Sequence, residues 1–423
     1  MNLRITRELL AATERVLATA LEFTQPADAV LSAYFRSQRQ LGQRERGFIA
    51  EAVYAVLRRK RTLERLCAGA AAPRRLLLAA LLRLQGWNQR QLADAVTIPE
   101  AEWLGTLRSS EDAGGETSLA ERTDLPDWLA ERLLRERDEA DLIALARALN
   151  QPAPLDLRVN VIKAGRDAVL EQLKQGGLEA EACPLAPQGI RLKGKPALAR
   201  HALFLSGAIE VQDEGSQLLG ALVAPKRGEM VVDFCAGAGG KTLLLGALRR
   251  STGRLYAFDV AEKRLSRLKP RLARSGLSNV HPAVISGEGD QRIKRLAGKI
   301  DRVLVDAPCS GLGTLRRNPD LKWRQTPQGI EELTRKQSSI LEAAARLVKP
   351  GGRVVYATCS LLAEENEAIV DAFLAGHAEF RRLDCSDILA RQGIGLDAGI
   401  DLRLQPHRHV TDGFYAAVLE REK

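Results

Sequence analysis

The chain has 423 residues, of which 45% are hydrophobic and 27% are charged, and it carries a formal net charge of +10. Such a composition is ordinary for a globular protein with a large core, and the length favours about three domains. No apolar run reaches the roughly 20 residues that a membrane-spanning helix needs, so no membrane span is expected. The basic excess favours a polyanionic partner such as a nucleic acid, although basic surfaces without such a partner are also common.

The first 23 residues are superficially similar to an export signal. Their apolar residues are interrupted by four charged side chains, Glu8, Glu14, Arg15 and Glu22. A signal peptide needs an unbroken apolar segment, whereas this spacing is typical of an amphipathic helix. We therefore expect a cytoplasmic protein.

Residues 1–145 contain no clear strand and many segments rich in Leu, Ala, Arg and Glu, which predicts an all-helical domain. In "RGFIAEAVYAVLRRKR" the apolar positions recur at i, i+4, i+7 and i+8 and lie on one helical face: Ile49, Val53, Val56 and Leu57. The basic run 58–61 that follows is typical of a solvated helix end, with a phosphate contact as the alternative.

A proline-bearing break, "NQPAPLDLRVNVIKAG", ends the helical region at residues 150–165. Short strand-like and helical pieces alternate over 155–210, which predicts a small α+β module. These changes in pattern divide the chain into a helical domain at 1–145, the small module at 146–225 and a third domain at 226–423.

From about residue 225 strand-like and helix-like segments alternate regularly. The expected strands are 230–235, 254–260, 279–285, 302–308 and 353–360. Alternation of this kind with apolar strands predicts an α/β fold with an open, doubly wound and mostly parallel sheet. Pro270 lies inside the helix expected at 262–276 and is expected to kink it. A last apolar segment, 412–420, has no helix after it and is expected at an edge of the sheet.

The first of these strands runs into a glycine-rich turn, "VVDFCAGAGGKT", at residues 231–242. A Walker A phosphate loop requires glycine where Cys235 stands, and a dinucleotide fingerprint requires its third glycine where Thr242 stands. The turn still lets the backbone approach a ligand closely, because glycine has no side chain. It therefore favours an adenosyl ligand without a pyrophosphate.

Acidic residues follow the other strands. Asp259 ends the second strand, 19 residues after Gly240, where a carboxylate can bind both ribose hydroxyls. Asp290 follows the third strand as the candidate for the adenine edge, with Glu288 as its competitor, and Asp306 ends the fourth strand. A single acid at such a position is most often a helix N-cap, but their joint register with the strands favours S-adenosylmethionine as the cofactor.

The six cysteines are scattered, with no C-x-x-C pair and no histidine at metal-ligand spacing. This pattern argues against a zinc site and against a disulfide framework, so no metal is expected. Cys67, Cys183 and Cys385 are expected to be packing residues. Cys309 and Cys359 differ, because "DAPCSG" and "ATCS" each end a predicted strand of the same sheet, at the face where the cofactor should lie.

Two thiols at one edge of the sheet suit the methylation of a pyrimidine. Carbon 5 of the ring is too weak a nucleophile to attack a methyl sulfonium. A thiolate that adds to carbon 6 makes carbon 5 enamine-like, so covalent catalysis divides one difficult step into two easier ones. The proton on carbon 5 must then leave before the first thiol is expelled, which gives a second thiol a role. Asp306 could bond the ring nitrogen and the exocyclic amine and so select cytosine over uracil.

These motifs resemble those of the Sun/NOP-type RNA cytosine-5 methyltransferases, and in particular the RsmB-type enzymes of small-subunit rRNA. The resemblance covers roughly residues 125–423 and rests on these stretches: "DFCAGAGGKT", "DAPCSGLGTLRRNPDLKW", "KPGGRVVYATCSLLAEENEAIV", "HRHVTDGFYAAVLER", "LRVNVIK" and "VQDEGSQL". It implies a Rossmann-like methyltransferase domain at 226–423. The helical region is similar to the NusB-like, RNA-binding domain that RsmB-type enzymes carry.

The resemblance also implies roles for the site residues. In the family's scheme the Thr-Cys-Ser thiol, here Cys359, is the nucleophile, and the Pro-Cys-Ser thiol, here Cys309, assists release. DNA cytosine methyltransferases attack instead with a Pro-Cys thiol, so Cys359 separates the two classes. The family usually has proline at position 238, so we expect a turn of altered rigidity rather than lost binding. The implied cofactor-binding residues are Cys235, Ala236, Gly237, Ala238, Gly239, Gly240, Lys241, Asp259, Asp290 and Asp306.

The segment "LRRNPDLKWR", at 315–324, places several basic side chains and Trp323 directly after the Cys309 motif. Such a segment could bind RNA phosphates and stack a splayed base on the indole. A basic loop with the indole packed inward is the alternative.

The sequence therefore predicts a monomeric methyltransferase that uses S-adenosylmethionine to methylate carbon 5 of a flipped cytosine in RNA, with 16S rRNA as the expected substrate. The same chemistry on tRNA or DNA is one alternative. A ribosome-assembly or antitermination factor with a vestigial methyltransferase fold is the other. The two thiols and Asp306 argue against a vestigial fold, since a binding module does not need them.

Overall fold

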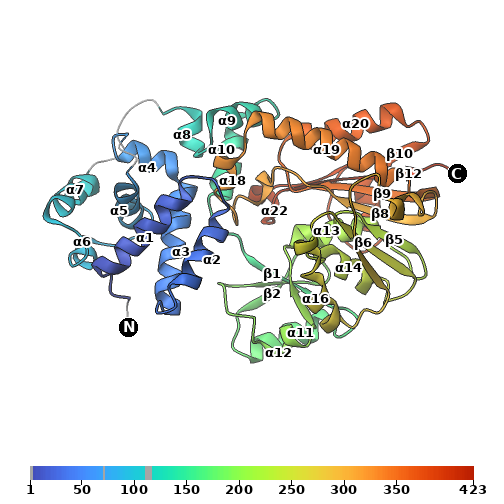
Figure 1. The fold of residues 1–423 in the computed structure, drawn as a ribbon, viewed down its shortest axis with the longest axis horizontal. Helices are drawn as coiled ribbons and strands as arrows, with labels where there is room; N and C mark the ends of the chain where they lie inside the picture. The colour runs from blue at the N-terminus through green and yellow to red at the C-terminus, as the bar shows by residue number, and fades with distance from the viewer. Residues whose placement is uncertain (1–2, 70–71, 110–116) are drawn as a thin grey trace. The chain divides into compact units, whose positions relative to one another are not determined.

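The computed structural model describes residues 3–69, 72–109 and 117–423 (Figure 1). The chain forms two compact units. One, the helical unit, comprises Met1–Pro152 and Thr314–Thr326, and the other, the sheet unit, comprises Ala153–Gly313 and Pro327–Lys423. In the described ranges, no helix is long and apolar enough to cross a membrane.

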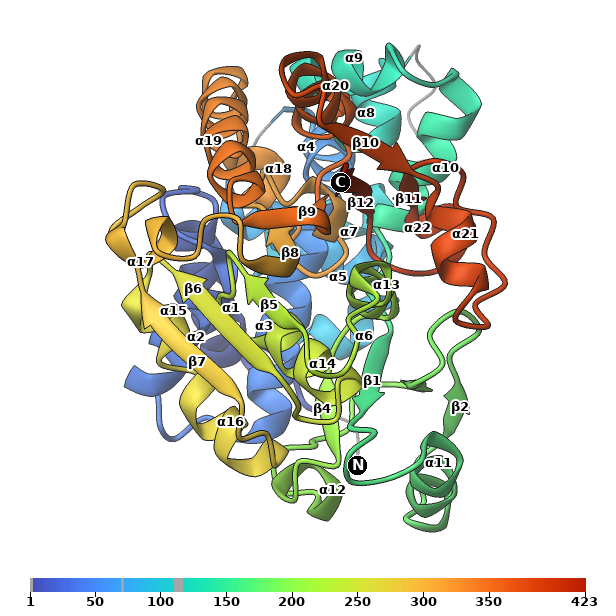
Figure 2. The same ribbon diagram turned by 90° about the vertical axis from the view of Figure 1, so that its right-hand side faces the viewer.

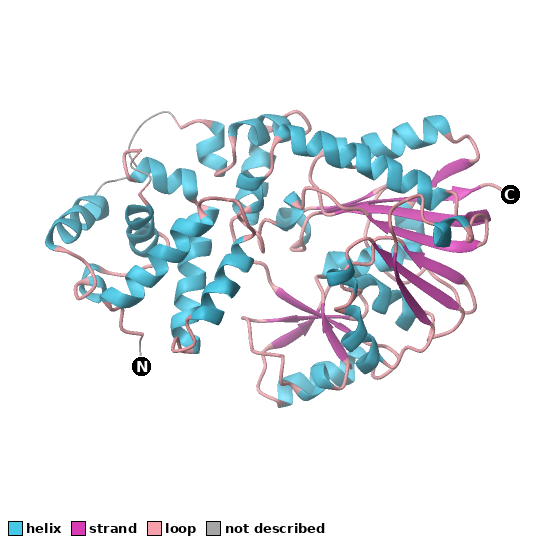
Figure 3. Cartoon of the chain, in the orientation of Figure 1, coloured by secondary structure: helices cyan, strands magenta, loops and turns pink. Residues whose placement is uncertain are grey.

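The helical unit shows helices and no strand in its described residues, as expected for the N-terminal region (Figure 3). Ile49, Val53, Val56 and Leu57 are fully buried on one face of α3, so the predicted helical face is confirmed. The helices are α1 (Arg7–Ala20), α2 (Ala27–Ser37), α3 (Gln43–Arg58), α4 (Lys60–Leu66), α5 (Pro73–Arg83), α6 (Gln89–Leu92), α7 (Ile98–Ser109), α8 (Leu119–Thr123), α9 (Asp127–Leu134), α10 (Glu139–Leu149) and α18 (Leu321–Arg324).

The basic run 58–61 is not a solvated helix end. Helix α3 ends at Arg58, whose side chain is buried, and α4 begins at Lys60. Each of the other cations lies within 3.2 Å of a carboxylate: Arg59 of Asp124, Lys60 of Glu64 and Arg61 of Asp127. The run is therefore engaged inside the helical unit, because acids from α4, from α9 and from the residue after α8 contact it.

Trp323 is packed inward, which is the second of the two alternatives for this residue. Its indole N–H donates to the carbonyl of Leu57 at 2.9 Å, and its ring centroid lies 6.3 Å from that of Phe23. The ammonium of Lys60 lies 5.1 Å from the ring centroid. The indole is therefore a packing anchor for the 314–326 segment rather than a free platform for a base.

Lys322 beside it is only 1% exposed. Its ammonium donates to the carbonyl of Arg58 at 2.8 Å and to Oδ1 of Asn150 at 3.1 Å. Burial lowers the pKa of Lys322 to about 7, because the charged form is costly in a medium of low polarity.

The sheet unit contains a small antiparallel sheet of order β2-β3-β1-β4. Its core is apolar and is built around Leu157, Val169, Ile190 and Ile209. The elements are β1 (Leu155–Val159), α11 (Arg166–Gln175), β2 (Ala180–Ala182), β3 (Gly189–Leu192), α12 (Ala202–Leu205) and β4 (Ile209–Val211). The three-part division of the chain stays a prediction.

The large sheet has the order β10-β12-β9-β8-β5-β6-β7, with β11 paired to β12. Strands β7, β6, β5, β8 and β9 are parallel, and Figure 2 shows β7, β6 and β5 as neighbours. The strands are β5 (Met230–Asp233), β6 (Arg254–Asp259), β7 (Val280–Val284), β8 (Ile300–Asp306), β9 (Val348–Thr358), β10 (Phe380–Leu383), β11 (Leu402–Leu404) and β12 (Phe414–Arg421). The predicted α/β class with a mostly parallel sheet is confirmed.

Helices cover both faces of this sheet. Successive side chains of a strand point to opposite faces, so Val231 packs with α13, α14 and α16 whereas Val232 packs with α19 and α20. Both faces are buried, which explains the continuous apolar strands. The helices are α13 (Glu214–Val223), α14 (Gly240–Leu248), α15 (Glu262–Leu265), α16 (Leu268–Ser275), α17 (Gln291–Lys294), α19 (Pro327–Ala345), α20 (Glu367–Gly376), α21 (Cys385–Ala390) and α22 (Pro406–His409), with 3-10 turns η1 (Leu312–Thr314) and η2 (Ala363–Glu365).

Two expectations for this unit differ from the structure. Strand β12 lies between β9 and β10, antiparallel to both, and β10 forms the edge. Its run of apolar residues suits an internal strand buried on both faces better than an edge. The expected helix 262–276 is divided into two helices, and Pro270 stands in the first turn of α16. Backbone N–H groups in the first turn have no acceptor within the helix, so a proline there costs no hydrogen bond.

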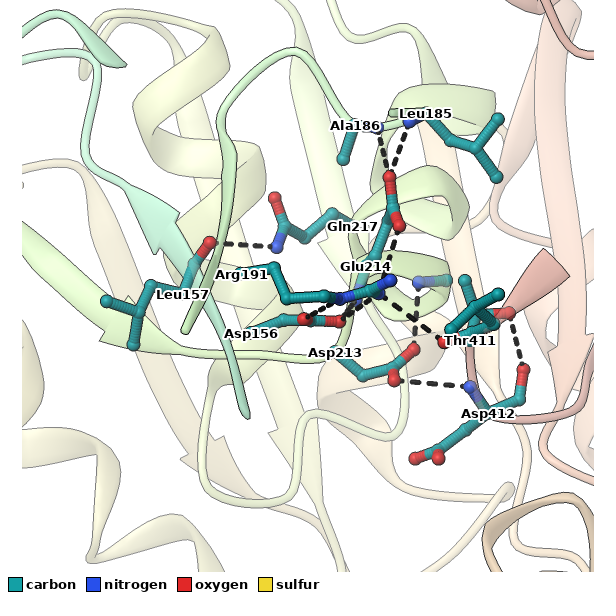
Figure 4. Close-up of polar contacts among 12 residues, drawn as sticks. Asp156, Leu157, Leu185, Ala186, Arg191, Asp213, Glu214, Gln217, Thr411 and Asp412 are labelled. Atoms are coloured by element: carbon teal, nitrogen blue, oxygen red, sulfur yellow. Dashed lines mark hydrogen bonds and ion pairs between the residues drawn. The ribbon is translucent and has the colours of Figure 1, made fainter. Parts of the chain in front are cut away.

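A buried ionic network joins the small sheet to α13 (Figure 4). The guanidinium of Arg191 binds Asp156 at 2.7 Å and Glu214 at 3.2 Å, and both carboxylates are fully buried. Backbone N–H groups of Leu185 and Ala186 also donate to Glu214. Asp156 and Glu214 lie close to Cys183, a set of residue types that can bind metals. Because Arg191 already binds both carboxylates, the group is an ion pair rather than a cation site.

Candidate active site

A cavity of about 640 Å³ opens at the carboxyl ends of the parallel strands of the large sheet. This is the edge at which open α/β sheets bind ligands, and the volume is in the range of small-molecule pockets. Among the described residues, all the predicted site residues except Gly239 and Asp290 line it. They are Cys235, Ala236, Gly237, Ala238, Gly240, Lys241, Asp259, Asp306, Cys309 and Cys359.

The glycine-rich turn after β5 needs glycine for two different reasons. Gly237 has φ +55°, and a Cβ built on it would meet nothing within 4 Å, so its missing side chain leaves open space in the cavity. Gly239 has φ +81°, and a Cβ there would fall 2.2 Å from the side chain of Leu268. Gly239 therefore serves the packing of the turn on α16, whereas Gly237 leaves room for a ligand.

Two arginines from outside the turn hold its carbonyl groups. Arg158, a buried residue of β1, donates to the carbonyl of Gly240 at 2.8 Å. Arg271 of α16 donates to the carbonyl of Ala238 at 2.7 Å and binds Glu210 of β4 at 2.9 Å. Position 238, where the family usually has proline, is thus fixed through its carbonyl oxygen. The small sheet contributes directly to the shape of the cavity.

Asp259 ends β6 and is 3% exposed. Its carboxylate accepts N–H groups from Gly237 at 2.8 Å and Ala261 at 2.7 Å, and Arg264 lies 3.2 Å away. A carboxylate offers about four lone-pair sites, and Arg264 reaches both oxygens, at 3.2 and 3.3 Å, so ribose hydroxyls would take the place of this exposed guanidinium. Together with the open space at Gly237, this arrangement fits the ribose of an adenosyl ligand.

Asp290 is not brought into the cavity, whereas Glu288 lines it. Asp290 caps α17, accepting from the N–H groups of Arg292 at 2.8 Å and Ser286 at 3.0 Å. These backbone hydrogen bonds hold the pKa of Asp290 below its usual value. The N-cap alternative raised for such acids is the arrangement that the structure shows here.

Lys241 and Asp306 form an ion pair in the cavity, with Nζ 2.7 Å from Oδ2. Burial is the largest single effect and would lower the pKa of Lys241, but the charge and hydrogen bond of Asp306 together with the charges of Cys359 and Asp233 outweigh it, so the pKa is raised. The lysine therefore stays charged and binds a carboxylate. This agrees with the rejection of a Walker A loop, whose lysine binds phosphate.

The two motif cysteines lie side by side in the cavity, with their Sγ atoms 3.4 Å apart. The backbone N–H of Cys359 also points at Sγ of Cys309, at 3.3 Å. The hydrogen bond to Cys359 and burial hold the pKa of Cys309 well above its ordinary value. Cys309 is therefore a thiol near neutral pH and can donate to the sulfur of Cys359.

The other cysteines behave differently. Cys67, Cys183 and Cys385 are buried, as expected, and burial raises the pKa of Cys67 to about 11 and that of Cys385 to about 12. Cys235 lines the cavity, and burial likewise raises its pKa well above the ordinary value. The low thiolate fraction makes these thiols poor nucleophiles.

Sequence reasoning missed several residues of the site. Asp233 lines the cavity at the end of β5 and accepts the hydroxyl of Thr242 at 2.6 Å, and burial raises the pKa of Asp233 to about 7. Gln212 and Asp213, from the stretch after β4, also line the cavity. Glu365 lies behind the cysteines. The quoted stretches "VQDEGSQL" and "CSLLAEENEAIV" contain three of these residues, but nothing in their spacing assigns a role.

Comparison with known proteins adds independent information. Residues 220–420 match the family model described as 16S rRNA methyltransferase RsmB/F, and residues 125–199 match the ferredoxin-like domain of RsmF/B-like methyltransferases. A Synechocystis protein named "Probable ribosomal RNA small subunit methyltransferase B" is 36% identical over 89% of this chain and 91% of its own length. The chain belongs to the RsmB/F methyltransferase family. The family is S-adenosylmethionine-dependent, so this chain is a methyltransferase of that class.

Solved structures agree with this family assignment. The crystal structure of PH0851 is 27% identical, covers the whole of both chains and superposes with a TM-score of 0.80. A methyltransferase homologue from Pyrococcus horikoshii is 31% identical over 72% of this chain and 97% of its own, with a TM-score of 0.61. The fold described above is therefore shared with these two proteins of known structure.

Proposed function

We propose that the protein is an RNA cytosine-5 methyltransferase that acts on 16S rRNA through a covalent adduct at Cys359. The observation that carries this function is the pair of thiols 3.4 Å apart in the cavity that also holds the Lys241–Asp306 ion pair. The relative named as a small-subunit rRNA methyltransferase supports rRNA as the substrate.

The residues at the strand ends would hold S-adenosylmethionine, which supplies an electrophilic methyl group when bound. The turn 235–241 would approach the adenosyl moiety along the open side of Gly237, and Asp259 would accept the ribose hydroxyls. Glu288 lies nearer to the adenine position than Asp290 does in this proposal, because only Glu288 of the two lines the cavity.

Cys359 begins the reaction on cytosine. Its sulfur forms a bond to carbon 6, the ring electrons move toward N3, and the thiol proton ends on N3. The Cys309 thiol donates a hydrogen bond to the attacking sulfur and stabilises its thiolate form. Asp306, paired with Lys241, accepts the N3–H and the exocyclic amine. Uracil would present a carbonyl oxygen to the same carboxylate, so cytosine is favoured.

Cys309 completes the reaction. After methylation carbon 5 carries both a methyl group and a proton. Cys309 first gives its thiol proton to solvent, and its thiolate then takes the proton from carbon 5. The double bond between carbons 5 and 6 re-forms, the bond from carbon 6 to Cys359 breaks, and the Cys359 sulfur leaves with the N3 proton as a thiol. The sulfur of Cys309 lies within 3.4 Å of the Cys359 sulfur, and carbons 5 and 6 are neighbours in the ring. The two sulfurs are therefore close enough for one to reach carbon 6 and the other the proton on carbon 5.

The helical unit offers a surface for the RNA backbone. Arg36, Arg39 and Arg46 line a hollow on α2 and α3 together with Phe35. Arg46 lies 5.6 Å from the Phe35 ring, and the two other arginines are exposed. Phe35 itself is half-buried against the helical core, so the arginines would offer contacts to RNA phosphates rather than a stacking platform for a base.

The test is a trapping experiment. Cys309→Ser incubated with substrate RNA and S-adenosylmethionine should accumulate a covalent complex that survives denaturing gel electrophoresis. Cys359→Ala should form none and should lose turnover. Full turnover by Cys359→Ala would contradict the mechanism.

Two further measurements separate the alternatives. Methylation rates on 16S rRNA, tRNA and duplex DNA distinguish the substrate classes, and 16S rRNA is expected to be fastest. Calorimetry with S-adenosylmethionine distinguishes an enzyme from a vestigial fold, because a non-catalytic assembly factor would bind none.

A further inference from the structure

Glu365, in the turn η2, lies directly behind the two cysteines and is fully buried. Its carboxylate accepts the backbone N–H of Ser310 at 2.8 Å and the Ser310 hydroxyl. It also accepts the hydroxyl of Ser360. Ser310 directly follows Cys309, and Ser360 directly follows Cys359. One carboxylate therefore bridges the two turns that carry the reactive sulfurs.

Other contacts complete the bridge. Gln337 of α19 donates to Glu365 at 2.9 Å and to the carbonyl of Pro308 at 3.0 Å. The hydroxyl oxygens of Ser310 and Ser360, which both face Glu365, lie 3.1 Å apart. The donors belong to three parts of the chain, the two cysteine turns and α19, so neither cysteine turn can shift without breaking bonds to the same carboxylate.

The energetics make this bridge unusual. In the described residues, no lysine, arginine or histidine forms an ion pair with Glu365, although the side chain is fully buried. A buried carboxylate without a cation is costly unless neutral donors satisfy its oxygens. Here they come from both cysteine turns and from α19, so the cost of burial is offset only when the two turns are together.

We propose that Glu365 is a positioning residue that keeps the Cys309 sulfur beside the Cys359 sulfur, a role that rests on the proposed function for its catalytic consequence. Glu365 does not line the cavity and acts through Ser310 and Ser360. Separation of the turns would leave Cys359 able to form the adduct but would remove Cys309 from carbon 5. The release step should therefore suffer more than adduct formation.

The kinetic test compares Glu365→Ala, Glu365→Gln and the control Glu367→Gln. Glu367 stands two residues away on α20 and binds Arg403 in a separate ion pair. With 16S rRNA, Glu365→Ala should slow adduct release at least tenfold, accumulate covalent complex as Cys309→Ser does, and keep KM for RNA within about twofold. Glu365→Gln should be intermediate, because glutamine keeps one acceptor oxygen. The control should behave as wild type.

A second measurement needs no RNA. Phenylarsine oxide condenses with two neighbouring thiols, forming two As–S bonds and releasing water. Wild type should bind it tightly, and Cys309→Ser should bind it weakly, which assigns the signal to this pair. Glu365→Ala should lose at least tenfold in affinity for the probe, and Glu367→Gln should lose none.

The outcomes are distinguishable from one another. Wild-type probe affinity in Glu365→Ala, or equal slowing of adduct formation and release, would overturn the positioning role. If Glu365→Ala does not fold, Ser360→Ala replaces it, since it removes one donor and leaves the carboxylate, and the same partition of rates is expected. Failure of Cys309→Ser to trap RNA while the probe results hold would count against the proposed function and leave the bridge intact.

Discussion

Two buried carboxylates of the sheet unit are satisfied in opposite ways. Glu214 is paired with the guanidinium of Arg191, which also binds Asp156 (Figure 4). Glu365 receives only neutral donors, from the turns that carry the cysteines and from α19. The first arrangement neutralises charge and ties the small sheet to α13. The second leaves a negative charge beside two thiols. The same residue type therefore stabilises the fold at position 214 and is proposed to position the reactive thiols at position 365.

The largest effect is expected where the cation of the first network is removed. Arg191→Met leaves Asp156 and Glu214 buried without a counter-charge and should lower the free energy of unfolding by about 3–5 kcal/mol. Denaturant unfolding of the full chain measures this. The control is Lys193→Met, an exposed cation paired with Glu179, which should leave the midpoint unchanged. Equal midpoints for the two variants would show that the buried network does not stabilise the fold.

The effect of Glu365 should instead be visible in the pH dependence of adduct release. The Cys359 hydrogen bond, burial and the charge of Glu365 all raise the pKa of Cys309. Because the thiolate is the base, the rate of adduct release should rise about tenfold per pH unit from pH 7 to 8.5. Glu365→Gln should move the profile to lower pH. Rapid-quench measurement of adduct decay provides the rate, and a flat profile would contradict Cys309 as the base.

A third buried charge, in the helical unit, sharpens the comparison. Burial lowers the pKa of Lys322 to about 7, so between pH 7 and about 10 the unfolded chain binds a proton that the folded chain does not. The free energy of unfolding should therefore rise with pH across that window. The contribution of Lys322 alone should lower the equilibrium constant for unfolding about tenfold per pH unit. Below pH 7 the group contributes no slope. Denaturant unfolding at pH 7, 8 and 9 measures this dependence, and Lys322→Met should show a smaller rise in the free energy of unfolding with pH than wild type. The same rise in both proteins would contradict the assignment to Lys322.

The smallest effects are expected for exposed charges. Arg36→Ala and Arg39→Ala should each weaken RNA binding a few-fold and reduce the salt dependence by about one phosphate contact. Arg4, which is exposed but paired with Asp94, provides the control Arg4→Ala and should change neither quantity. Filter binding at several salt concentrations measures both. Equal losses in all three variants would argue against a defined RNA surface on α2 and α3.

The sequence predicted the parts of the fold and site that depend on local pattern. Apolar strands with regular spacing gave the parallel sheet, and the glycine turn and both cysteines line the cavity because they end its strands. The same rule placed Asp290 with the other acids, yet its carboxylate caps α17. An N-cap and a ligand contact use the same residue type at the same position, so spacing does not separate them.

What could not be predicted depends on contacts that are distant in sequence. Glu365 meets Ser310 across 55 positions, and Trp323 meets Leu57 across 266. Strand β12 lies inside the sheet because β10 and β11, which precede it in the chain, pair with it on the side away from β9. None of these contacts produces a periodic pattern in the sequence, because each depends on how helices, strands and turns pack after they have formed.

The most direct test of the covalent mechanism is to identify the cysteine in the trapped complex. Cys309→Ser would be crosslinked to substrate RNA, digested with nuclease and protease, and sequenced by mass spectrometry. A methylated cytidine nucleotide attached to the peptide that contains Cys359 is the predicted result. Attachment to any other cysteine, or an unmodified Cys359 peptide in a complex that retains RNA, would contradict the account.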